Sequence, residues 1–121
     1  MSNPVELIEQ IDRDASDLDR LSKAIHDATS EVERIEEKWD VALDTVMAAL
    51  EDEFAEAGRK SVPEHTAISA ARREHRTTYQ EFRRAKRRLE KLQMQLHAKR
   101  AAINGRQSEL SALKEELRAM A

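Results

Sequence analysis

The sequence contains no cysteine, only two glycines and two prolines in 121 residues, and few aromatic residues, which make up 3% of the chain. Without cysteine the chain can form no disulfide framework and no thiolate metal site, and it offers no cysteine nucleophile. So few turn-forming residues exclude β-sandwich, β-barrel and doubly wound α/β folds, since these architectures need a turn about every ten residues. The absence of cysteine is also typical of a reducing compartment, and we expect a cytoplasmic location.

Long apolar runs are absent as well. No stretch approaches the roughly 18 residues of a membrane-spanning helix, and the first residues lack the basic and then apolar pattern of a leader peptide. We therefore expect a protein that does not contact membranes. What the sequence has in abundance is charge, because 37% of its residues are Asp, Glu, Lys or Arg. The fold class that this composition favours is all-α.

Apolar residues recur every seven positions through the first half of the chain, which is the heptad pattern of a coiled coil. Position a of the heptad is held by Ile11, Leu18, Ile25, Val32, Trp39 and Val46. Position d, three residues later, is held by Leu21, Ala28, Ile35, Ala42 and Ala49, with Asp14 as the one polar exception. The pattern ends after Ala57, and Gly58 supplies the left-handed residue that commonly ends a helix. It predicts a helix over residues 5–57.

A second helix is predicted over residues 62–119, after a turn at residues 58–61. Ser61 and Glu64 have the spacing of a capping box, and Pro63 suits the first turn of a helix. The heptad positions of this helix are Ile68, Ala71, His75, Thr78, Phe82, Ala85, Leu89, Leu92, Leu96, Lys99, Ile103, Arg106, Leu110, Leu113, Leu117 and Met120.

We therefore expect one domain, residues 1–121, in which two long helices form an antiparallel coiled-coil hairpin. The short turn favours antiparallel neighbours. Gly105 costs about 1 kcal/mol relative to alanine inside a helix, but the heptad is unbroken there, so the second helix is expected to be continuous. Because a single two-helix contact buries little apolar surface, two hairpins could also pair into a four-helix bundle dimer.

The two predicted helices carry opposite charges. Residues 1–57 contain 17 acids and 5 bases, whereas residues 58–121 contain 7 acids and 16 bases. Folding back after residue 57 brings Asp14 near Lys99 and Arg106, which indicates polar pairing among otherwise apolar heptad positions. The same register places a group of acids on the first helix near a group of arginines on the second. The acids are Glu31, Glu33, Glu36 and Glu37, and the arginines are Arg83, Arg84, Arg87 and Arg88.

The sequence offers no pattern that indicates catalysis. There is no glycine-rich phosphate loop, and the four histidines, His26, His65, His75 and His97, do not have the spacing of metal ligands on a helix. Carboxylate pairs abound, but a slender hairpin has no desolvated cleft that would shift a pKa. We therefore predict no enzyme activity, no cofactor, no metal site and no small-molecule substrate.

A second apolar stripe lies beside the heptad positions near the predicted turn. We call it the tip stripe, and it consists of Leu43, Met47, Leu50 and Phe54. In one interpretation it widens the intramolecular core against Ala67, Ala70 and Tyr79. In the other it binds a protein partner or a second copy of the chain, because contiguous aromatic and aliphatic side chains carry most interface energy.

The second helix contains a basic stretch from Arg72 to Lys91. The heptad assignment predicts that Arg72, Lys86 and Arg88 flank the helix contact. It predicts that the other basic side chains point toward solvent, namely Arg73, Arg76, Arg83, Arg84, Arg87 and Lys91. These six could follow a phosphate backbone, with Tyr79 stacking on a base. A solvated or protein-facing surface is the alternative.

The first helix could instead bind a protein through its acidic residues. An acidic helix can mimic DNA and occupy a DNA-binding enzyme of the host, although a solvated face explains the same residues. The candidates are Asp12, Asp17, Asp19, Asp27, Glu33, Glu37, Asp40 and Asp44.

The layout from about Trp39 to Leu117 is an amphipathic helix, a short glycine-basic-Ser-Val turn and a long helix with periodic Ala, Arg, Tyr and Leu. It comprises Gly58-Arg59-Lys60-Ser61-Val62-Pro63, Ala70-Ala71-Arg72, Tyr79, Ala85, Leu89, Leu92, Leu96 and Ile103. In this layout the chain resembles small helical accessory proteins of tailed bacteriophages. The resemblance implies a non-enzymatic protein of the host cytoplasm, encoded in some phages among recombination and replication genes, and it implies no site residues.

The sequence thus predicts a non-enzymatic interaction protein that binds a protein partner through the tip stripe and its charged faces. The alternatives are a DNA-binding helper in phage recombination or replication, and an acidic inhibitor of a host enzyme.

Overall fold

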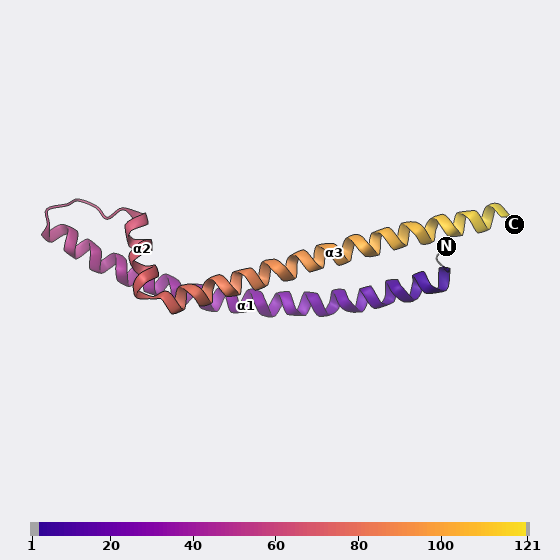
Figure 1. Ribbon diagram of the computed structural model, residues 1–121, viewed down its shortest axis with the longest axis horizontal. Helices are drawn as coiled ribbons and strands as arrows, with labels where there is room; N and C mark the ends of the chain where they lie inside the picture. Colours follow the sequence, from indigo (N-terminus) through magenta and orange to yellow (C-terminus); the bar gives the residue numbers. More distant parts are fainter. Residues whose placement is uncertain (1–2, 121) are drawn as a thin grey trace. The chain divides into compact units, whose positions relative to one another are not determined.

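The computed structural model describes residues 3–120, which fold into three helices, α1 (Pro4–Glu56), α2 (Glu64–Glu74) and α3 (Arg76–Met120), without a strand (Figure 1). The expected all-α class is therefore confirmed. The chain divides into two compact units. The terminal unit combines the beginning of α1, up to Asp27, with α3 from Glu90 onward, and the turn unit runs from Ala28 to Leu89.

In the terminal unit the beginning of α1 packs against α3, and the two segments run in opposite directions (Figure 1). Leu7 and Ile103 are buried between them, as the heptad assignment of Ile103 requires. Other heptad residues of this unit are half-buried, among them Leu18, Leu21 and Leu96. The heptad ends early, because Leu117 and Met120 are 59% and 84% exposed.

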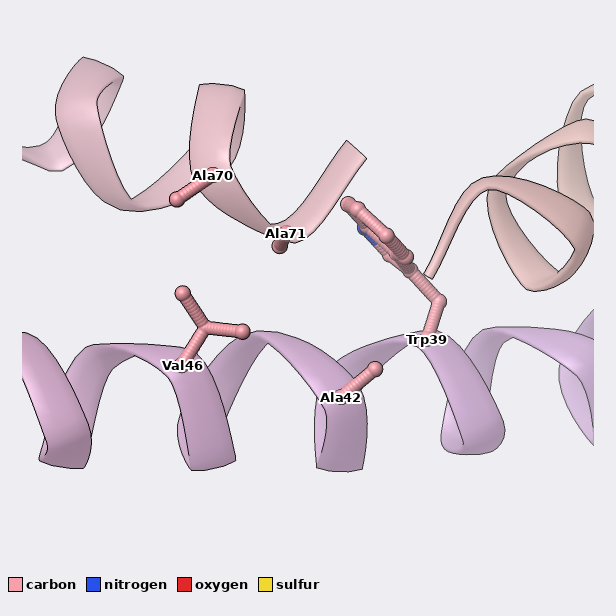
Figure 2. Packing of buried hydrophobic residues seen from close by; sticks show 5 residues of the cluster. All are labelled: Trp39, Ala42, Val46, Ala70 and Ala71. Carbon is pink, nitrogen blue, oxygen red and sulfur yellow. The ribbon is translucent and has the colours of Figure 1, made fainter. Parts of the chain in front are cut away.

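The core of the turn unit lies between α1 and α2. Figure 2 shows Trp39, Ala42 and Val46 of α1 facing Ala70 and Ala71 of α2. Ala71 is fully buried, and the absence of a long side chain lets the two backbones approach closely. The half-buried side chains packed against this cluster are Leu43, Leu50, Tyr79 and Phe82. Ala49, which was expected at the contact, is exposed.

Helix α1 ends where the sequence predicts. Gly58 has a φ of +77°, the left-handed conformation in which a Cβ would be strained. The Gly58 N–H donates to the Ala55 carbonyl over 3.1 Å, and the Arg59 N–H donates to the Phe54 carbonyl over 2.8 Å. This pair of hydrogen bonds is the Schellman motif, which satisfies carbonyls that the helix end would otherwise leave free.

The second helix begins two residues after the expected start at about residue 62. α2 begins at Glu64 after Pro63, whose backbone is extended, and no side chain caps the first turn, so the capping box of Ser61 and Glu64 is not formed. The reason is local, because the residue before a proline is disfavoured in the helical conformation. Val62 therefore stays outside the helix, and the Pro63 carbonyl accepts hydrogen bonds from the N–H groups of Thr66 and Ala67.

The prediction of one continuous second helix is also wrong, because the helix breaks at His75. This residue has φ −117° and ψ 46°, and its N–H donates to the Ala71 carbonyl to end α2. No proline or glycine stands at the break. Helix α3 resumes at once, because the Tyr79 N–H donates to the His75 carbonyl at 3.0 Å. Gly105, in contrast, lies within α3, as expected.

Candidate nucleic-acid interface

The turn unit has a basic hollow of about 610 Å³, formed by the end of α2 and the beginning of α3. We call it the arginine hollow, and it is lined by Arg72, Arg73, Arg76, Tyr79, Gln80, Arg83, Arg84 and Arg87. Within residues 3–120, no carboxylate lines it. Since arginine stays protonated at any physiological pH, the hollow carries six fixed positive charges.

Helical spacing explains why these side chains share one face. Arg76, Gln80, Arg83 and Arg87 follow one another at intervals of three or four residues, so they lie one above another on α3. At 1.5 Å per residue, the row from Arg76 to Arg87 is roughly 16 Å long. The hollow is therefore an elongated basic strip along a helix.

Tyr79 joins the hollow to the core of the turn unit. Its ring centroid lies 5.2 Å from that of Trp39, and the two rings are tilted by 46°. The Cζ atom of Arg72 lies 4.7 Å from the centroid of the Tyr79 ring, and that of Arg83 lies 5.8 Å from it. Both distances are within the range of a cation–π interaction. A half-buried aromatic ring thus holds one arginine from each helix.

A second hollow, of about 490 Å³, mixes both charges. It is lined by Glu31, Arg34, Ile35, Lys38, Glu81, Arg84, Ala85 and Arg88. Glu31 does lie beside Arg84 and Arg88 here, as the predicted register requires. Its carboxylate accepts a hydrogen bond from Arg34 at 2.7 Å, however, and this bond raises the pKa of Arg34.

The other acids expected beside the arginines, Glu33, Glu36 and Glu37, line a separate hollow of about 530 Å³ with Ser30, Arg34 and Asp40. The residues of the proposed acidic inhibitor surface are all exposed except Asp17, which is half-buried and paired with Lys99. Those exposed members are Asp12, Asp19, Asp27, Glu33, Glu37, Asp40 and Asp44.

The structure brings six of the seven predicted nucleic-acid-binding residues together, five phosphate-contacting arginines and the predicted stacking residue Tyr79. They are Arg73, Arg76, Tyr79, Arg83, Arg84 and Arg87. Lys91 does not line the arginine hollow and belongs to the terminal unit. Arg72 lines the hollow although the heptad assigns it to the helix contact, and Gln80 is a further lining residue that the heptad pattern does not single out. Helical spacing from Arg76 and Arg83 indicates Gln80, whereas the break at His75 separates Arg72 from this periodicity.

The tip stripe is half-buried rather than free. Leu43 and Leu50 pack against the core of the turn unit, which favours the core interpretation for these two residues. Met47 and Phe54 are also half-buried, and the Cζ atom of Arg59 lies 5.2 Å from the centroid of the Phe54 ring.

An ion-pair cluster occupies the middle of the terminal unit. Asp14 is 1% exposed, accepts a hydrogen bond from Lys99 Nζ at 3.2 Å, and also pairs with Arg106. This confirms the predicted pairing. Lys99 Nζ lies 3.2 Å from Asp17 as well, and Arg20 pairs with the same carboxylate. Hydrogen bonding by Lys99, and then by Arg20, lowers the pKa of Asp17 despite partial desolvation.

Other kinds of site have less support. In the described part of the chain, no group of three or more His, Asp or Glu side chains is arranged to hold a metal ion. None of the helices within residues 3–120 combines the length and the apolar character needed to cross a membrane. Comparisons of the chain with protein-family models, with curated proteins and with solved structures find no match. The resemblance to phage accessory proteins therefore stays a prediction.

Proposed function

We propose that this protein is a non-enzymatic accessory protein that binds nucleic acid through phosphate contacts in the arginine hollow. The observation that carries the proposal is the convergence of six arginines from α2 and α3 on one surface without an interleaved acid among the residues lining it. Guanidinium groups bind phosphate through two parallel N–H donors, so arginine is well suited to such a surface. The predicted phage context would make such a protein a helper in recombination or replication.

Binding of this kind does not depend on base sequence. The arginine row follows a helix surface, and nothing in the hollow resembles an element that enters a groove to read base edges. Each neutralised phosphate releases counterions, so the affinity falls with salt. If five or six phosphates are contacted, the affinity for a DNA duplex should fall roughly a thousandfold between about 50 and 200 mM salt.

Fluorescence anisotropy of a labelled DNA duplex of random sequence, measured with the purified chain at these two salt concentrations, tests the proposal. The double variant Arg83→Gln/Arg84→Gln should weaken binding equally for different sequences and should make the salt dependence shallower. The matched control is Arg100→Gln/Arg118→Gln, which removes the same charge from exposed positions outside the hollow. Equal losses in both variants would mean that net charge, and not the hollow, attracts DNA.

A second candidate function is binding of a protein partner, or of a second copy in a four-helix bundle, through the tip stripe. The observation that favours it is the partial exposure of Met47 and Phe54, which are not members of the packed core. Coiled-coil pairing between copies would cover these apolar surfaces. The size of the chain in solution, measured by sedimentation, tests the homodimer.

A further inference from the structure

All four aromatic rings of the chain are already engaged by its own side chains. Trp39 is buried in the core, and Tyr79 contacts Trp39, Arg72 and Arg83. The two phenylalanines lie under cations, with Lys86 Nζ 5.3 Å from the Phe82 centroid and Arg59 over Phe54. Single-stranded nucleic acid gains about 1–3 kcal/mol for each base that stacks on an aromatic side chain. The arginine hollow offers no free ring for this purpose.

The two arginines that lie over the Tyr79 ring can still bind phosphate. A guanidinium group that lies over a ring keeps its five N–H donors at its edges, where they remain available to phosphate oxygens. Arg72 comes from α2 and Arg83 from α3, and the helix is broken between them at His75. Tyr79 lies in the first turn of α3, and its N–H donates to the His75 carbonyl at 3.0 Å. Its ring is therefore the contact shared by the two helices that supply the arginines.

From this geometry we infer that Tyr79 is a positioning residue, which holds Arg72 and Arg83 in one phosphate-binding surface, and that this surface takes duplex in preference to single-stranded nucleic acid. The inference rests on the proposed function. In a duplex the bases are already stacked on one another, so a surface that contacts phosphates alone loses nothing there. On a single strand the same surface would forgo the stacking contribution.

The binding experiment compares Tyr79→Phe with Tyr79→Leu on two probes, a 24-base-pair DNA duplex and one of its strands. We expect the native chain to bind the duplex more tightly, with the steeper salt dependence. Tyr79→Phe keeps the ring and should bind within about twofold of the native chain. Tyr79→Leu should weaken duplex binding about tenfold and reduce the salt slope by about one phosphate contact.

A structural measurement separates this role from simple stabilisation of the fold. In the NMR spectrum of the free protein, the ring current of Tyr79 should shift the side-chain resonances of Arg72 and Arg83. The shift should persist in Tyr79→Phe and disappear in Tyr79→Leu, and circular dichroism should show that both variants stay helical. In the background Arg72→Gln/Arg83→Gln, Tyr79→Leu should have no further effect on binding, because coupled residues are not additive.

The outcomes are distinguishable. If the native chain binds neither probe, the proposed function fails and the duplex preference fails with it. If the native chain binds duplex but folded Tyr79→Leu binds equally well, only the role of Tyr79 is overturned. If Tyr79→Leu loses single-strand binding more than duplex binding, the ring stacks on bases and the inference is wrong.

Discussion

Asp14 and Lys99, which are separated by 85 positions in the chain, meet at 3.2 Å in the terminal unit. The carboxylate of Asp14 is almost completely buried at a heptad position where apolar residues are the rule, and Arg106 is its second partner. A buried polar contact of this kind adds little stability, but it can fix the register of two helices, because any shift would leave a charge without a partner.

The first prediction concerns this carboxylate. Asp14→Ala should lower the free energy of unfolding by about 1–3 kcal/mol, because it leaves two cations without their buried acid. The loss stays below that of a fully buried pair, since Lys99 and Arg106 are each 31% exposed and can reach water. Urea denaturation followed by circular dichroism measures the change. A variant as stable as the native chain would contradict the prediction.

The triple variant Asp14→Leu/Lys99→Leu/Arg106→Leu separates stability from register. It completes the apolar heptad positions, so it should be at least as stable as the native chain. Without the polar contact the helices can pair in other registers and orientations, and sedimentation should then reveal mixed oligomers. A single species of native size would show that the ion pairs do not specify the register.

The heptad pattern predicts some features of the packing from the sequence alone, but not all of them. Burial of Ile103 and Ala85, and the meeting of Asp14 with its two partners, follow directly from seven-residue spacing and an antiparallel register. The break at His75 does not, because no proline or glycine marks it. The residues on its two sides pack differently, since Ala71 is buried in the core and Tyr79 is half-buried beside it, and heptad spacing does not contain that difference.

The sequence predicts the arginine hollow only in part, because helical spacing holds within α3 but not across the break at His75. Arg76, Arg83 and Arg87 share a face of α3 by periodicity, so their grouping needs only a helix, whereas Arg73 lies in α2, before the break. Arg72 precedes the break, and a heptad carried without interruption through His75 assigned it to the helix contact. The role of the Tyr79 ring could not be predicted either, because its contact with Trp39 joins residues of different helices.

The pH dependence of stability should reflect Asp17. Its folded-state pKa is lowered, first by hydrogen bonding from Lys99, and therefore lies below the unfolded value of about 4. The paired carboxylate contributes stability above the unfolded value, and this contribution is lost as the pH falls through the folded value. Asp17→Asn should consequently be less stable than the native chain at pH 7, with the difference shrinking below pH of about 4. Thermal unfolding at a series of pH values checks this, and a constant difference would contradict it.

The two glycines provide a matched pair. Gly58→Ala should destabilise the chain by about 1 kcal/mol or slightly more, because alanine is strained in the left-handed conformation. No atom lies within 4 Å of the added Cβ at either glycine, so the backbone conformation alone decides whether alanine stabilises or destabilises the fold. Gly105 lies inside α3, and Gly105→Ala should stabilise the chain by about 0.5–1 kcal/mol. Changes of the same sign in denaturant titrations would contradict this account of the turn.

The tip stripe yields the last prediction, because the structure divides its residues into two pairs. Leu50 packs against the core of the turn unit, so Leu50→Asp should lower the free energy of unfolding by about 2 kcal/mol or more whether or not a partner binds. Met47 is half-buried outside that core, and Met47→Asp should leave helicity nearly unchanged.

If the native chain is a dimer through the tip stripe, Met47→Asp should make it monomeric in sedimentation at micromolar concentrations, because burying a carboxylate at an interface is unfavourable. Val41→Asp is the matched control, since Val41 is 65% exposed on the same helix outside the stripe, and it should leave the dimer intact. A monomeric native chain would exclude the homodimer and leave only a heterologous partner for this surface. Equal dissociation of both variants would show that added negative charge on α1, and not the apolar stripe, controls association.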